Sequence, residues 1–154
     1  CLMVHGSEEQ KREHLPKIAS GEVHWGQGFS EPGSGSDLAS LQTRAVRDGD
    51  DFVINGQKIW TSGAHWSNWM FGLFRTDPNA KKQKGISYLL IDLKTPGIEI
   101  RPVWTLDGNR HVNEVFFNDV WVTEADVLGP VDDGWKVVAA HVSVIDESLV
   151  WKPA

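Results

Sequence analysis

The stretch from Gln27 to Asp37 is rich in small residues and hydroxyls, a combination that could bind a polar ligand. The pattern predicts that a strand ends near Ser30 and leads into a loop with further hydroxyls at Ser34 and Ser36. The loop glycines let backbone N–H groups approach a ligand closely, and such concave loops favour anions or partial negative charge. A plain tight turn explains the same residues about equally well, so both interpretations stay open.

A second stretch, from Lys58 to Gly63, places one large indole before two hydroxyls at the end of a predicted strand. Trp60 could form a stacking wall, and Thr61 and Ser62 could donate hydrogen bonds. The alternative is a tryptophan buried in the core and followed by a turn, and the stretch taken alone favours that alternative. In either case, replacing Trp60 with alanine is expected to cost about 3–5 kcal/mol of stability.

Three common catalytic or binding patterns fail on inspection. The stretch from Gly28 to Pro32 begins like a nucleophile elbow, but Pro32 stands where that motif needs glycine. The stretch from Gly33 to Leu38 begins like a dinucleotide fingerprint but lacks its third glycine and its strand–helix–strand context. The six histidines show neither metal-ligand spacing nor the two-histidine pattern of zinc proteases, so no metal site is predicted.

The chain begins with a pattern that predicts a short helix. Ser7 is a suitable N-cap, with Glu8 and Glu9 in the first turn and Gln10 placed to complete a capping box. Gly21 ends the pattern. One helix of this length cannot bury its apolar face alone, so we expect it to pack on the rest of the chain or on another domain.

From residue 22 to about residue 122 the alternation of polar and apolar residues has a period of two, which predicts strands. Candidate strands cover residues 52–60, 68–76, 86–93, 98–104 and 112–121, and turn clusters separate them. Asn55-Gly56 predicts a type I′ turn at a hairpin tip. Strands joined by short turns favour an antiparallel sandwich or small barrel, with a second helix resuming within residues 134–150.

Composition excludes several classes of function. The chain has 154 residues, 40% of them hydrophobic and 23% charged, which suits one folded domain. A net charge of −6 argues against general nucleic-acid binding, and no apolar run is long enough for a membrane span. Cys1 is the single cysteine, so no disulfide framework is possible and a reducing, cytoplasmic location is expected.

Taken together, these stretches resemble the middle domain of the acyl-CoA dehydrogenase family. The resemblance runs in the family's order through Phe29 to Asp37, Asn55 to Ser62 and Asn113 to Val120, and ends near Val138. It implies a mainly β fold: a small antiparallel β-barrel with a short helix at each end. It also implies that residues 1–21 are the remnant of an N-terminal helical domain, that residues 22–130 form the barrel, and that residues 131–154 begin a C-terminal helical domain that is truncated or altered.

The resemblance also assigns roles in binding FAD and acyl-CoA. The strand through Gln27, Gly28, Phe29 and Ser30 would follow the pyrimidine edge of the flavin, where the Ser30 hydroxyl would bond the ring. Trp60, with Thr61 and Ser62 beside it, would pack against the ring, and Ser62 would lie near flavin N5. Ser36 would contact the acyl-CoA.

The family reaction is α,β-dehydrogenation of acyl-CoA thioesters, with electrons passed to an electron-transfer flavoprotein. The family's catalytic carboxylate belongs to the C-terminal helical domain, so the resemblance places no catalytic residue in this chain, and the chain alone is expected to be inactive. Glu31 is interpreted as a structural loop residue rather than as the base. A homo-oligomer is expected for the full enzyme, without nucleic acid and without a membrane span.

Two alternatives remain at this stage. The same fold could serve an acyl-CoA oxidase or a flavin monooxygenase, which differ in access of oxygen to the flavin. A non-catalytic β-barrel binding module would use the same strands without any reaction.

Overall fold

The structure is a computed structural model that describes residues 1–139. Helix α1 (Leu2–His5) precedes α2 (Glu8–Ala19), and the capping box predicted at the start of α2 is present. The Ser7 amide donates to Gln10 Oε1 (3.0 Å), and the Gln10 amide donates to Ser7 Oγ (3.1 Å). Residues 134–139 are helical as predicted, whereas the rest of that predicted helix and the altered tail lie outside the described residues.

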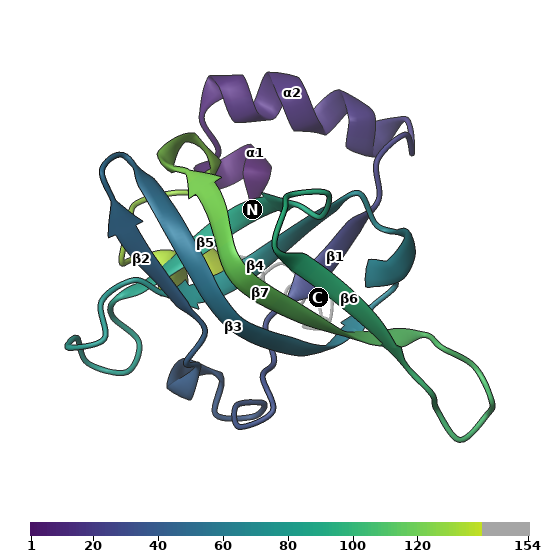
Figure 1. The fold of residues 1–154 in the computed structure, drawn as a ribbon. Helices are drawn as coiled ribbons and strands as arrows, with labels where there is room; N and C mark the ends of the chain where they lie inside the picture. The colour runs from purple at the N-terminus through teal and green to yellow at the C-terminus, as the bar shows by residue number, and fades with distance from the viewer. Residues whose placement is uncertain (140–154) are drawn as a thin grey trace, which may run out of the picture.

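The remainder is a curled sheet of seven strands that forms half a barrel (Figure 1). The strands are β1 (Trp25–Gly28), β2 (Arg44–Asp48), β3 (Asp51–Ser62), β4 (Trp69–Arg75), β5 (Ile86–Asp92), β6 (Ile98–Val103) and β7 (Val112–Thr123). Their order is β1-β4-β2-β3-β7-β6, with β5 on the other side of β4. The mainly β, barrel-like fold is therefore confirmed. The sheet is not purely antiparallel, because β1 and β2 both run parallel to β4.

The hairpin predicted at Asn55-Gly56 is wrong. Both residues lie inside the continuous strand β3, and the sharp turn is made by Gly49 and Asp50 between β2 and β3. Asn55 instead pairs with a bulge in β7: its amide donates to the Asp119 carboxylate (2.9 Å) and accepts from the Asp119 amide (3.0 Å). Gly56 is needed for close packing, because a Cβ there would lie 2.8 Å from the Thr43 Cα.

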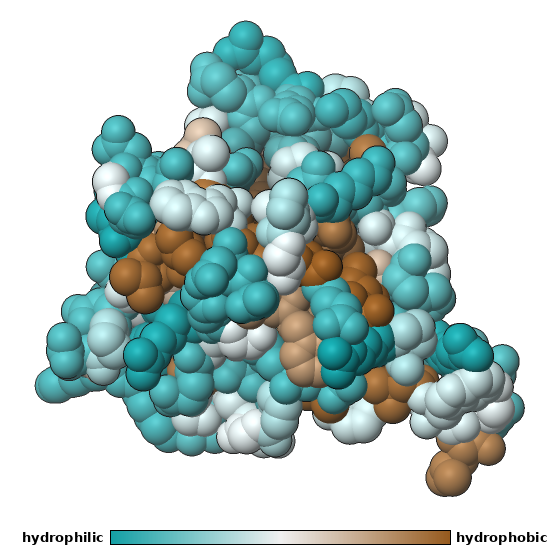
Figure 2. All heavy atoms as spheres, in the orientation of Figure 1, coloured by the Kyte–Doolittle hydropathy of each residue, from teal (hydrophilic) through white to brown (hydrophobic). Residues whose placement is uncertain are grey.

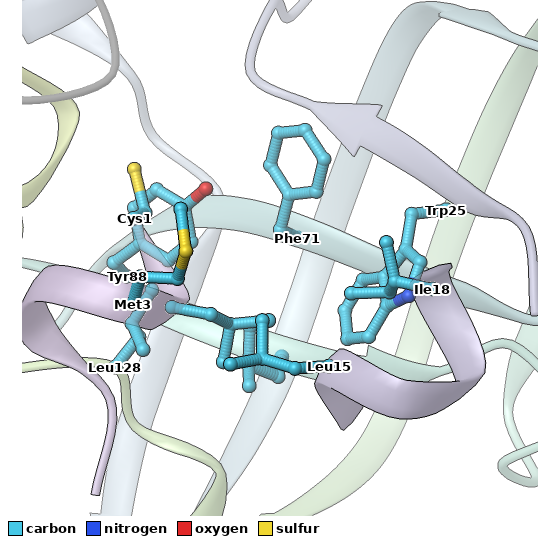
Figure 3. Close-up of a pocket in the computed structure, with 10 residues that line it drawn as sticks. Cys1, Met3, Leu15, Ile18, Trp25, Phe71, Tyr88 and Leu128 are labelled. Carbon is cyan, nitrogen blue, oxygen red and sulfur yellow. The ribbon is translucent and has the colours of Figure 1, made fainter. Parts of the chain in front are cut away.

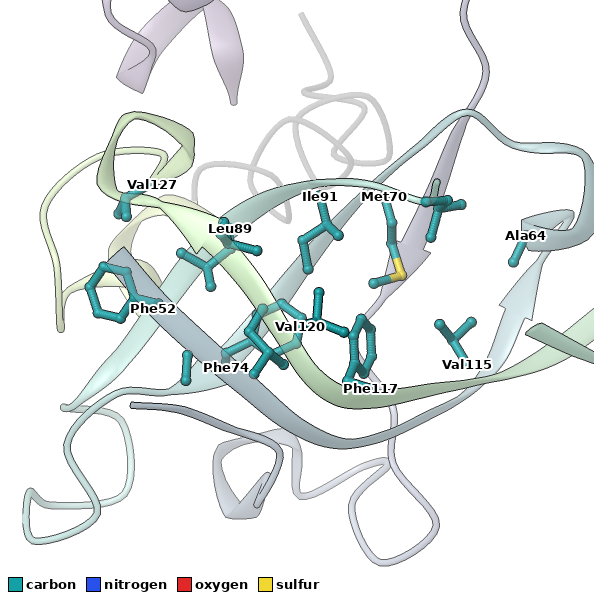
Figure 4. Packing of buried hydrophobic residues seen from close by; sticks show 14 residues of the cluster. Phe52, Ala64, Met70, Phe74, Leu89, Ile91, Val115, Phe117, Val120 and Val127 are labelled. Atoms are coloured by element: carbon teal, nitrogen blue, oxygen red, sulfur yellow. The ribbon is translucent and has the colours of Figure 1, made fainter. Parts of the chain in front are cut away.

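The core fills the inside of the curl. Figure 4 shows side chains from β3 and β7 pointing towards those from β4 and β5, with Phe52, Phe74 and Phe117 among the largest. Because side chains alternate along a strand, one face of each long strand supplies the core while the other faces outward. The alternation of polar and apolar residues in the sequence results from this arrangement.

Helix α2 is fixed to the rest of the chain by two buried side chains. The side-chain amide of Gln10 donates to the backbone carbonyls of Ala125 (2.7 Å) and Val127 (3.0 Å). The His14 ring lies edge-on to the rings of Trp25 and Trp69, with centroids 5.2 and 4.8 Å away. The prediction that this helix leans on the rest of the chain holds.

Burial lowers the pKa of His14, and this should make the stability of the protein depend on pH. The folded-state pKa lies below the unfolded value of about 6.5, so the unfolded chain binds more protons as the pH falls through this range. The unfolding free energy should therefore fall between about pH 7.5 and about pH 5. Urea titrations of the protein and of His14→Phe, which keeps an aromatic ring there, should show a smaller fall in the variant. Equal falls would contradict a buried neutral His14.

Two of the large hydrophobic residues exposed on the surface lie in one projecting loop. The loop between β6 and β7 stands away from the body at the lower right of Figures 1 and 2, and it exposes Trp104 and Leu106. Within residues 1–139, no helix has the length and apolar character needed to span a membrane.

Candidate functional site

The two stretches singled out in the sequence meet at one cavity of about 400 Å³ at the ends of β1 and β3. The Ile59 amide donates to the Ser30 carbonyl (2.9 Å), which joins the two stretches directly. The side chains that line the cavity are Trp25, Gln27, Phe29, Ser30, Ile59, Trp60, Ser62 and Phe71. Five of the seven residues predicted to contact a flavin are therefore brought together here: Gln27, Phe29, Ser30, Trp60 and Ser62.

Trp60 is held in an unusual conformation and does not lie in the core. Its side chain is 58% exposed and its φ is +63°. It belongs to a bulge in which two residues of β3, Ile59 and Trp60, face the single residue Glu114 of β7. A left-handed backbone at a bulky residue costs about 1–3 kcal/mol and persists only where surrounding contacts impose it. The alternative of a core tryptophan is wrong.

Thr61 and Gly28 do not line the cavity, although the sequence places them in the same two stretches. The Thr61 side chain is buried, and its hydroxyl has no hydrogen-bond partner within residues 1–139. Gly28 lies opposite Gly72 where β1 pairs with β4, and a Cβ there would come within 2.6 Å of the Met70 sulfur. Both residues support the strands that carry the cavity residues.

Ser36 lies outside the cavity, exposed in the loop between β1 and β2. That loop begins with a tight turn in which Glu31 and Ser34 exchange two backbone hydrogen bonds (2.8 and 3.0 Å). The Ser34 hydroxyl donates to the Asp37 carbonyl (2.9 Å), and the Asp37 carboxylate pairs with Lys82. The loop is therefore a tight turn at its start, and Ser36 is exposed to solvent without lining the cavity.

Glu31 is occupied by structural bonds. Its carboxylate accepts from the Gln42 amide (2.6 Å), the Thr43 amide (2.9 Å) and the buried Lys58 ammonium (2.7 Å). Burial acts to raise the pKa of Glu31, but Lys58 and these bonds together hold it below its ordinary value. Burial lowers the pKa of Lys58 to about 8, against the opposing charge of Glu31. An ionised carboxylate with its oxygens engaged is poorly suited to accept a proton from a substrate.

Sequence reasoning missed Trp25, Ile59 and Phe71 as cavity residues. Trp25 occupies β1 two residues before Gln27, so the same alternation that places Gln27 at the cavity could have found it. Phe71 reaches the cavity because it pairs with Gln27 in the parallel register of β1 and β4. No local pattern in the sequence announces that pairing.

A second, apolar cavity of about 290 Å³ adjoins the first, between the N-terminal helices and the sheet. Figure 3 shows Leu15 and Ile18 of α2 on one side, with Phe71 and Tyr88 rising from the sheet on the other. Trp25 and Phe71 line both cavities. The site is thus a polar pocket with an apolar extension, a combination common in sites for organic ligands.

Comparison with known proteins identifies the family of this chain. The model of the acyl-CoA dehydrogenase middle domain matches residues 26–120. The acyl-CoA dehydrogenases FadE29 and IpdE1 of Mycobacterium tuberculosis are 45% and 50% identical to the chain, over 99% and 97% of it. The chain covers 39% and 40% of the length of these two relatives.

A solved structure described as the Tcur3481-Tcur3483 steroid ACAD has the same fold, with a TM-score of 0.86 and 45% identity. The similarity covers 89% of this chain and 35% of that one. The family match spans more than half of the chain and includes both stretches that line the cavity. The chain therefore belongs to the acyl-CoA dehydrogenase family, and residues 26–120 form its middle domain.

Proposed function

We propose that the chain is the flavin-binding part of an FAD-dependent acyl-CoA dehydrogenase, and that the cavity beside Trp60 receives the flavin ring. The observation that carries this proposal is the exposed indole of Trp60, held on a left-handed backbone beside Ser30 and Ser62 in one cavity. Backbone strain of this kind concentrates at ligand sites, where it prearranges a contact surface. A core position or a plain turn gives no reason for it.

The donors in the cavity fit a flat heteroaromatic ligand with several acceptors. Gln27, Ser30 and Ser62 bring an amide and two hydroxyls to a pocket whose other side chains are largely aromatic. The indole N–H of Trp25, which also lines this cavity, is buried without a hydrogen-bond partner in the described part of the chain. An unpaired buried donor is costly, and a bound acceptor would relieve that cost.

Each residue would then have a distinct task. The Ser30 hydroxyl would donate a hydrogen bond to the region of the flavin ring that gains negative charge. Ser62 would form a hydrogen bond near flavin N5. Trp60 would cover the ring and exclude water. FAD, when bound, supplies the two-electron acceptor for oxidation of the acyl-CoA. Fixed donors placed where charge develops favour the reduced form and need no rearrangement during the reaction.

The base that removes the α-proton would come from outside residues 1–139. In this scheme residues 22–130 are the flavin-binding barrel, residues 1–21 belong to an N-terminal helical domain, and residues 131–154 lead into a C-terminal one. Ser36 would meet the acyl-CoA on the loop surface. An electron-transfer flavoprotein would accept the electrons, and the working enzyme would be an oligomer.

The substrate class can be narrowed by the similarity to a steroid ACAD. We propose that the acyl group is large and polycyclic, and that the apolar cavity beside Trp25 and Phe71 extends the space near the flavin. Reduction of the bound flavin without oxygen, by a steroid-derived acyl-CoA and by a straight-chain one, would test this. Faster reduction by the straight-chain thioester would contradict it.

The assignment of Ser62 is tested by Ser62→Ala in the full-length protein. One neutral hydrogen bond contributes about 0.5–1.5 kcal/mol, so its loss should lower kcat several-fold if the bond strengthens during hydride transfer. The flavin potential should fall as well, while the unfolding free energy stays nearly unchanged because Ser62 is exposed. The matched control is Ser20→Ala, whose exposed hydroxyl donates to the Lys17 carbonyl at the end of α2. An unchanged potential and kcat in Ser62→Ala would remove this residue from the site.

A further inference from the structure

The sheet is interrupted where the loop that carries Ser36 leaves it. β1 and β2 both pair with β4, and residues 29–43 connect them, so the loop interrupts what would otherwise be one strand between β4 and β3. A broken strand leaves backbone carbonyls without their ladder partners, and buried carbonyls need a donor. Here the break lies directly beside Ser30.

The Lys58 side chain fills this break. Its ammonium donates to the carbonyl of Leu73 (2.6 Å), on β4, and to the carbonyl of Phe29 (3.4 Å), the residue before Ser30. It also pairs with Glu31 (2.7 Å), the residue after Ser30, with both side chains nearly inaccessible at 0% and 6% exposure. One buried cation therefore bonds the backbone of the residue before Ser30 and the side chain of the residue after it.

The same lysine lies at the start of the Trp60 bulge. Lys58 is the last residue of β3 in regular register with β7 before the bulge, and Thr61 is the first one after it. On the far side, the buried Asn113 amide donates to the Thr61 carbonyl (2.8 Å), and its oxygen contacts the His65 ring (3.1 Å). The left-handed backbone at Trp60 is thus held between two buried side-chain contacts, neither of which reaches the cavity.

We infer that Lys58, paired with Glu31, and Asn113 are positioning residues that impose the conformation of Trp60 and its distance from Ser30. Neither lines the cavity: Lys58 bonds the backbone of Phe29, which does line it, and Asn113 bonds the backbone of Thr61, the residue after Trp60. The inference rests on the proposed function only in taking Ser30 and Trp60 as the cofactor contacts. The conformation of Trp60 itself can be measured without any cofactor.

The test uses the full-length protein labelled with 5-fluorotryptophan and its ¹⁹F spectrum, in which Trp60→Phe identifies the Trp60 signal. Lys58→Met and Asn113→Ala should move or split that signal in the absence of FAD. The matched control is Arg75→Met, which removes another buried cation that bonds three carbonyls, those of Ala39, Lys82 and Lys84. Arg75 touches neither β3 nor Ser30 through these bonds, so its variant should leave the Trp60 signal in place.

Titration with FAD gives the second measurement. The Kd should rise about tenfold or more in Lys58→Met and Asn113→Ala, because small displacements of contact groups have large effects, and should change little in Arg75→Met. Should Lys58→Met fail to fold, Asn113→Ala reports on the same bulge from its other side. An unmoved Trp60 signal in the folded variants, or equal effects in Arg75→Met, would overturn the inference. A moved signal in a protein that never binds FAD would leave the positioning role intact and overturn the proposed function instead.

Discussion

Replacement of Gly56 by alanine should lower the unfolding free energy by about 3 kcal/mol, a large change for a single added methyl group. Gly56 has a φ of +142°, which L-residues rarely adopt, and a Cβ there would lie 2.7–2.8 Å from three atoms of Thr43. The backbone strain costs about 1–2 kcal/mol, and forced displacement of a packed neighbour adds a similar amount. Urea denaturation of the purified protein measures the change.

The matched control is Gly49→Ala, at the true tip of the β2–β3 hairpin. Gly49 also has a positive φ, of +63°, but a Cβ there meets nothing within 4 Å. Only the backbone cost applies, about 1 kcal/mol. If the two variants lost equal stability, then the close approach of Thr43 to Gly56 would not be a constraint of the folded state.

These two glycines show why the hairpin prediction failed. Asn-Gly is a strong turn signal because both residues tolerate positive φ, but the same tolerance serves a close packing contact. In β3 the Asn55 amide bonds the β7 bulge and Gly56 makes room for Thr43, so tertiary contacts decide what the local pair does. Gly49-Asp50, the pair that does form the turn, is also a local turn signal, so local signals alone do not tell which of the two pairs makes the turn.

The elements that followed from sequence alone are those fixed by local rules. The capping box fixed the start of α2, and the alternation of apolar residues located β4 to β7 within a residue or two. The site followed in part, since Ser30, Trp60 and Ser62 do meet at one cavity. The missing parts depend on non-local pairing: the parallel register of β1 and β4 brings in Phe71, and no sequence period encodes it.

Trp60 illustrates the same limit in energetic terms. The expected loss of about 3–5 kcal/mol for Trp60→Ala assumed a packed indole, whereas the side chain is 58% exposed and its backbone is strained. Trp60→Gly should be more stable than Trp60→Ala by about 0.5–1 kcal/mol, because relief of the left-handed strain exceeds the extra chain entropy of glycine.

Both Trp60 variants should nevertheless weaken FAD binding strongly and to a similar extent, because both lack the indole. A stacked indole that covers about 100 Å² of ring contributes about 2 kcal/mol, which corresponds to a rise in Kd of about 30-fold. Trp60→Phe retains an aromatic face and should lose only part of this affinity, which makes it the control for stacking. Fluorescence titration with FAD and urea denaturation of the three variants separate the two roles of this residue. If Kd followed stability across the series, with Trp60→Gly binding better than Trp60→Ala, the indole would not be the ring contact.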